Sequence, residues 1–183
     1  MSRRNPKSPG ARRRYELHLA VLVGGAAVSD ALALGSAAGA LCIGAAGLTL
    51  VRVVPWQLHR TLSHPPLWTL ALGYLWLLPG LAAKGIAQLD GTVPVTDMLH
   101  GVGVGALGTL TLVMMARAAM LRAHKPIAAF ADIGIAALLL SAAAISRLLA
   151  PYLAIARQWL LWLEASAWAA AFLILLLRLW RTA

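Results

Sequence analysis

Long apolar runs dominate this chain and restrict its fold more than any other feature. A helix that crosses the hydrocarbon core of a bilayer needs about 20 predominantly apolar residues. Only 12% of the residues are charged, whereas soluble globular proteins carry about 25%. The mean hydropathy of +0.78 agrees. The sequence therefore predicts a membrane protein that contacts the lipid bilayer along most of its surface.

Six apolar runs predict membrane helices, because Gly, Ala and Leu dominate them and the alternation typical of barrel strands is missing. The predicted fold is all-α: a polytopic bundle of six transmembrane helices in one domain, residues 15–183. A basic tail, residues 1–14, precedes it and is expected to be disordered. The first span is the weakest and meets the second at Ser29 and Asp30 with hardly a loop, so a re-entrant first segment is the alternative. The predicted spans are 15–29, 31–54, 67–89, 96–116, 127–149 and 159–180.

The basic residues are distributed unequally between the two sides of this predicted bundle. Thirteen of the 16 Lys and Arg residues fall on the side of the termini, and only Lys84, Arg147 and Arg157 fall on the other. The positive-inside rule then places both termini in the cytoplasm. With so strong a bias, any homo-oligomer should be parallel. The charge lies at the ends of the spans and not on one soluble face, so nucleic-acid binding is not expected.

His100 is the most informative ionisable residue, because such groups at membrane depth are costly and often functional. Gly101, Gly105 and Gly108 follow at i, i+4 and i+7 and form a smooth ridge, which another helix or a flat macrocycle can approach closely. At about 100° per residue, His100 shares a stripe with Met114. Imidazole and thioether ligate haem iron and copper, so the stripe fits one elongated cofactor or two metal centres. Plain helix packing is the alternative interpretation of the ridge.

The remaining polar residues favour structural roles. The single cysteine, Cys42, excludes an intrachain disulfide. Glu164 and Asp132 are expected to pair with basic residues, Glu164 with Arg157 and Asp132 with the basic segment 117–125, which lowers the cost of insertion. No ladder of carboxylates marks a path for protons or cations, and a transporter is the least favoured function.

One string of residues has a specific resemblance. Leu99-His100, followed by Gly105-Ala-Leu-Gly-Thr-Leu-Thr-Leu-Val-Met-Met-Ala-Arg117, resembles the C-terminal half of the NnrS family. These are multi-pass bacterial inner-membrane proteins linked to the response to nitric oxide and described as containing haem and copper. The chain departs from the family at Leu121-Arg-Ala-His-Lys-Pro126, where the family has Gly-His-Thr-Gly-Arg-Pro. Family members also have further spans before this region, and any ligand supplied there is missing.

The resemblance implies a haem b site at His100, with copper as the weaker cofactor. His100 would be the axial ligand, Gly101, Gly105 and Gly108 the wall, and Arg117 the partner of a propionate or of the last helix carbonyls. No second axial ligand is evident. The haem is then five-coordinate and open to a diatomic gas, or a partner chain supplies the ligand, or a separate cytoplasmic site exists. That separate site would use His18 with His59 or His64.

These residues and the resemblance together predict a haem-binding protein of the bacterial inner membrane. It would sense or handle nitric oxide or a related diatomic gas, as a parallel homo-oligomer or with another membrane subunit. The alternative is a cofactor-free assembly subunit that packs on a partner through its Gly-rich fourth helix. The sequence leaves open whether the protein catalyses a reaction.

Overall fold

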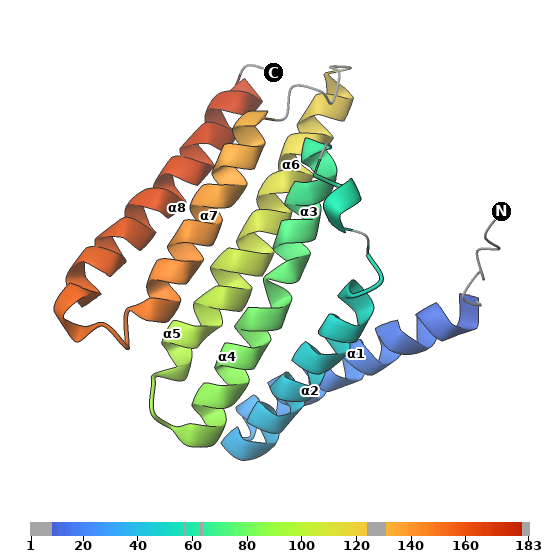
Figure 1. Cartoon of the computed structure of the whole chain (residues 1–183), viewed down its shortest axis with the longest axis vertical. Coiled ribbons are helices and arrows are strands. Elements are labelled where there is room, and N and C mark those ends of the chain that lie inside the picture. Colours follow the sequence, from blue (N-terminus) through green and yellow to red (C-terminus); the bar gives the residue numbers. More distant parts are fainter. Residues whose placement is uncertain (1–8, 57, 63, 124–130, 181–183) are drawn as a thin grey trace.

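The computed structural model describes residues 9–56, 58–62, 64–123 and 131–180, and over these ranges it contains helices and no strand (Figure 1). The predicted all-α fold is therefore confirmed. The predicted tail lies partly outside the described residues, and the first helix begins at Pro9. The main helices are α1 (Pro9–Ala31), α2 (Gly35–Val53), α3 (Pro65–Leu75), α4 (Leu77–Asp90), α5 (Val95–His100), a π-helix (Gly101–Gly108), α6 (Thr109–Arg122), α7 (Ala131–Leu149) and α8 (Arg157–Trp180). Two short 3₁₀ turns are Leu58–Arg60 and Ala154–Ala156.

Five of the described helical stretches are long and apolar enough to cross a membrane. They correspond to the second to sixth predicted spans, which are thus matched in number and place. Helix α1 is not among them; its sequence includes Glu16 and Asp30 as well as a run of arginines at 12–14. A count of six spans, and the side on which the termini lie, remain predictions. The five stretches are Gly35–Val53, Pro65–Asp90, Val95–Arg122, Ala131–Leu149 and Ala154–Trp180.

The connections between helices follow from local chemistry. The turn after α1 lies at residues 32–34, later than predicted, and includes Ala33 at a φ of 57°. Gly91, at a φ of 65°, ends α4 in the left-handed conformation that glycine adopts without strain. Pro79 has no N–H and cannot donate the helical hydrogen bond to the carbonyl four residues before it. This missing bond lies close to Trp76, where α3 passes into α4.

Helices α3 and α4 run end to end, as do α5, the π-helix and α6, and the other helices pack alongside these rods (Figure 1). Helix α1 packs on α2, α2 on α4, and α7 between the π-helix and α8. The α1–α2 turn, the α4–α5 turn and the α7–α8 link lie at one end of the molecule. The α2–α3 link lies towards the opposite end. This arrangement brings the polar residues of α5, α7 and α8 to the same end.

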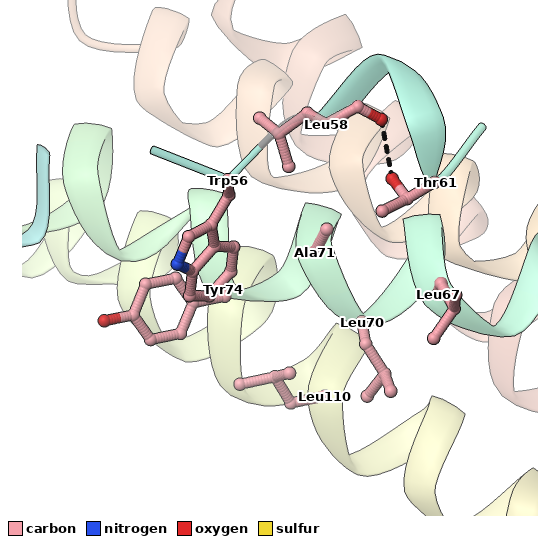
Figure 2. A pocket seen from close by; sticks show the side chains of 8 residues that line it. All are labelled: Trp56, Leu58, Thr61, Leu67, Leu70, Ala71, Tyr74 and Leu110. Atoms are coloured by element: carbon pink, nitrogen blue, oxygen red, sulfur yellow. Dashed lines mark hydrogen bonds between the residues drawn. The ribbon is translucent and has the colours of Figure 1, made fainter. Parts of the chain in front are cut away.

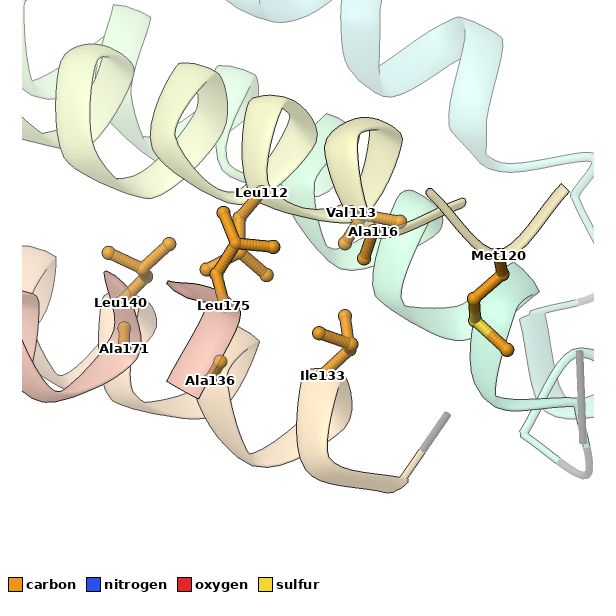
Figure 3. Close-up of a cluster of buried hydrophobic side chains, with 9 residues drawn as sticks. All are labelled: Leu112, Val113, Ala116, Met120, Ile133, Ala136, Leu140, Ala171 and Leu175. Carbon is orange, nitrogen blue, oxygen red and sulfur yellow. The ribbon is translucent and has the colours of Figure 1, made fainter. Parts of the chain in front are cut away.

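The largest core lies between α6, α7 and α8 (Figure 3). Leu112 and Met120 of α6 share this cluster with Ile133 and Leu140 of α7, and all four side chains are fully buried. Ala136 of α7 and Ala171 of α8 have no exposed surface. Such small side chains let membrane helices approach closely, so the Ala-rich sequence of α7 makes it the central helix of this half.

Candidate functional site

Five ionisable side chains of α5, α7 and α8 meet at the end of the bundle formed by the α4–α5 turn. We call Asp97, His100, Arg147, Arg157 and Glu164 the α5–α7–α8 polar cluster. Arg147 bridges the two acids: its Nη2 lies 3.0 Å from Asp97 Oδ1 and its Nη1 lies 3.2 Å from Glu164 Oε2. Arg157 Nη2 lies 3.7 Å from Asp97 Oδ2. Two acids and two arginines balance in charge, which is how ionised groups become tolerable at membrane depth.

Within this cluster, each ring nitrogen of His100 faces an oxygen atom. Its Nδ1 is 3.0 Å from the carbonyl oxygen of Thr96. A carbonyl can only accept, so Nδ1 carries the hydrogen and donates it. Its Nε2 faces Glu164 Oε1 at 3.6 Å, and the side chain is 31% exposed. In a neutral ring Nε2 therefore carries the free lone pair, which can bind a proton or a metal ion.

The glycine ridge after His100 is largely covered by the same chain. A Cβ on Gly101 would lie 2.7 Å from Gly80 Cα, and one on Gly105 would lie 2.6 Å from the Trp76 ring. Gly108 has ordinary space, with Leu140 at 3.7 Å. The ridge thus serves close helix contact, the alternative interpretation of the sequence.

Trp76 fixes this contact further, because its Nε1 donates a 2.9 Å hydrogen bond to Ser141 Oγ of α7. The ridge also forms the π-helix that begins directly after His100. π-Helices are rare and occur often at functional sites. The backbone thus marks His100 independently of its side chain.

The other predicted ligands do not join His100. Arg117 and the 57% exposed Met114 lie on α6, about 20–25 Å from His100 along the helix axis. The exposed His18, His59 and His64 lie on α1, on the first 3₁₀ turn and just before α3. The described ranges hold no group of three or more His, Cys, Asp or Glu side chains arranged for a metal ion. His124 falls outside the described residues.

Sequence reasoning missed the centre of the polar cluster. Asp97, which is only 4% exposed, was not singled out among the ionisable residues of the predicted spans. Glu164 was paired with Arg157, whereas its partners are Arg147 and His100. Asp132 pairs with Arg178 of α8 at 2.8 Å, and not with the segment 117–125 as far as that segment is described. Charge pairing was thus correctly expected, but its partners depend on which helices meet.

The comparison with protein families decides the relationship. The family model described as "NnrS protein" matches residues 3–183, which is nearly the whole chain. The chain belongs to the NnrS family. Membership indicates a multi-pass membrane protein of the nitric oxide response. Searches of the curated proteins and of the solved structures found no match.

The residues of this NnrS-family chain fit a haem only in part. His100 has the feature typical of metal-binding histidines, an Nδ1–H held by a backbone carbonyl, which leaves Nε2 facing Glu164. The glycines fit less well: Gly101 and Gly105 are closed by Gly80 and Trp76 and line no open slot. Arg117 is too distant along the helix for a propionate of a haem on His100. The donor chemistry therefore supports a ligand at Nε2 of His100, beside Glu164 and outside the packed ridge.

A second polar cluster joins α1, α2 and α4. Lys84 is 7% exposed; its Nζ donates a hydrogen bond to Asp30 Oδ2 and lies 3.7 Å from Cys42 Sγ. Gln88 donates to the other Asp30 oxygen. Burial by itself raises the pKa of Asp30, but the hydrogen bonds from Lys84 and Gln88 and the charge of Lys84 bring it below the ordinary 3.8. This ion pair attaches the end of α1 to the bundle.

We expect the attachment of α1 to weaken in acid. Because folding lowers the pKa of Asp30, the pair contributes its stability above about pH 3.8 and loses it as the pH falls through the lower folded value. The melting temperature in detergent, measured from neutral pH downwards, should fall in this range. Asp30→Asn should remove this decrease in melting temperature at low pH. Asp90→Asn, at an exposed residue of α4, should retain it. The same decrease in melting temperature at low pH in the wild type and both variants would contradict a stabilising role of the Asp30–Lys84 ion pair.

Proposed function

We propose that this protein is a haem-binding protein of the bacterial inner membrane that senses or handles nitric oxide, with His100 as the axial ligand. Family membership supports the nitric oxide response. The single observation that supports His100 is the hydrogen bond from its Nδ1 to the Thr96 carbonyl, which leaves Nε2 directed at the polar cluster. The π-helix that starts at the next residue supports the same position.

The roles of the surrounding residues follow from their contacts. Thr96 holds the tautomer of His100, and Glu164 stands beside Nε2 with its other oxygen bound to Arg147. Glu164 Oε1 therefore lies 3.6 Å from the nitrogen that would bind the metal. A haem bound at this position would supply an iron that takes a diatomic gas as its further ligand. Copper is the weaker candidate, with the imidazole and the neighbouring carboxylate as its donors.

The remaining ligands of such a haem come from outside the described cluster in this proposal. A parallel homo-oligomer, or another membrane subunit, would place a second ligand and the rest of the pocket against the exposed side of His100. The positive-inside distribution supports the parallel arrangement with cytoplasmic termini. The assembly alternative has less support, since Gly101 and Gly105 already pack on Gly80 and Trp76 of the same chain.

Absorption spectroscopy tests the proposal. The purified protein, expressed with ample iron and haem precursor, should show a Soret band that shifts on reduction and on addition of nitric oxide, with iron exceeding copper in metal analysis. His100→Gly should lose the band, and added imidazole should restore it, since it replaces the missing ring. His59→Ala, at an exposed histidine of the first 3₁₀ turn, should keep the wild-type spectrum. A wild-type protein without a Soret band, or a band unchanged in His100→Gly, would refute the haem assignment.

A further inference from the structure

An apolar groove of about 470 Å³ lies between the α2–α3 link, α3 and α6 (Figure 2). Its volume is within the range of small-molecule pockets, about 300–1,000 Å³. Leu58 and Thr61 lie on one side, Leu70 and Leu110 on the other, and Ala71 between them. Leu67 is 49% exposed, so the groove is open towards the surroundings of the bundle. None of the residues predicted as ligands lines it.

Few polar groups line this groove. Thr61 Oγ1 donates a 2.7 Å hydrogen bond to the carbonyl of Leu58. The hydroxyl of Tyr74 is buried, with no hydrogen-bond partner among the described residues. The groove therefore offers its occupant contact with hydrocarbon and few hydrogen bonds. That chemistry suits an acyl chain better than a quinone ring, whose carbonyls need donors.

One end of the groove is aromatic and cationic. Trp56 and Tyr74 stack there with ring centroids 4.9 Å apart (Figure 2). The Arg52 guanidinium lies 5.5 Å from the centre of the Tyr74 ring, and its Nη2 lies 3.3 Å from Glu16 Oε1. Between Arg52 and residue 64 the sequence has a second arginine, Arg60, and no acid. Tryptophan and arginine side by side are typical of the headgroup zone of a membrane.

We propose that this groove is a binding site for an anionic phospholipid, with one acyl chain along Leu70, Ala71 and Leu110 and the phosphate beside Arg52. The groove and the lipid are complementary, because an apolar groove open to the bilayer ends at a cation, as an acyl chain ends at a charged headgroup. Basic sites between membrane helices on the cytoplasmic side commonly hold anionic headgroups. The site is separate from His100 and does not depend on the proposed function.

Fluorescence quenching tests the site. Delipidated protein in detergent is titrated with phosphatidylglycerol or phosphatidylcholine that carries brominated acyl chains, and the signal of Trp56 is the difference between wild type and Trp56→Phe. Brominated phosphatidylglycerol should quench Trp56 at a lower concentration than phosphatidylcholine. Arg52→Gln should reduce this preference about fivefold, the effect of one basic residue near anionic lipid. Arg122→Gln, the same charge loss at the exposed end of α6, should leave it unchanged.

Two further variants separate the acyl chain from the headgroup. Ala71→Phe fills the groove and should abolish quenching by either lipid. Leu67→Phe, at the open side, should weaken the quenching and replaces Ala71→Phe in the test if that variant does not fold. Ala118→Phe, at an exposed alanine of α6 outside the groove, is the matched control. Glu16→Gln should preserve or strengthen the preference for phosphatidylglycerol, because Arg52 loses its competing carboxylate. Equal quenching by both lipids, full quenching in both filled variants, or displacement of the lipid by an isoprenoid quinone would overturn the proposal.

Discussion

Replacing Arg147 with leucine should lower the free energy of unfolding by about 3 kcal/mol, as expected when one partner of a buried ion pair is removed. Arg147 contacts two acids whose side chains are only 5% and 14% exposed, Asp97 and Glu164. Without it, two carboxylates remain in an apolar environment with the more distant Arg157 and His100 beside them. Reversible unfolding in mixed detergent micelles, followed by tryptophan fluorescence, measures the loss.

Two companion variants show whether the loss comes from uncompensated charge. Arg157→Leu removes a 51% exposed arginine that reaches Asp97 at 3.7 Å, so its effect should stay below about 1 kcal/mol. Adding Asp97→Asn and Glu164→Gln to Arg147→Leu should recover most of the stability, because the buried acids are then neutral. If Arg147→Leu and Arg157→Leu cost the same, or the triple variant recovers nothing, Arg147 does not organise the cluster.

The fold was predictable because membrane insertion depends on the length and hydropathy of single segments. Five of the six runs read from the sequence are membrane-length helices at the expected places. The boundary between the first two runs was the least certain and is where the structure differs. The last turn of α1 includes Asp30, which accepts hydrogen bonds from Lys84 and Gln88 of α4. Both donors lie more than 50 residues further along the sequence. Periodicity within one segment carries no information on such a partner.

The candidate site was predictable only where a residue is unusual in its own segment. His100 was found because an imidazole in an apolar, Gly-rich run is conspicuous. Thr96 lies only four residues before it on the same helix, but the contact with Glu164 depends on a helix that is distant in sequence and could not be read from spacing. The ridge was recognised, but Trp76 as its cover was not. The π-helix has no sequence signature beyond the abundance of glycine.

The second large effect is expected at the contact between α4 and the π-helix. Gly80→Ala should lower the free energy of unfolding by about 1–3 kcal/mol, the usual cost of overpacking. A Cβ on Gly80 would lie 2.7 Å from backbone atoms of Gly101 and Val102, and backbone cannot move aside as a flexible side chain does. The measurement is the same detergent unfolding as for Arg147.

Gly103→Ala is the matched control for Gly80→Ala, since it adds the same methyl group within the same Gly-rich region. A Cβ on Gly103 has no atom within 4 Å, so the change should be neutral or stabilise the helix by about 0.5–1 kcal/mol. The difference between the two variants isolates packing from helix propensity. Because Gly101 directly follows His100, displacement of the π-helix in Gly80→Ala should also disturb the imidazole, and histidine NMR shifts should change there but not in Gly103→Ala. Equal stability of the two variants would mean that α4 and the π-helix do not meet through Gly80.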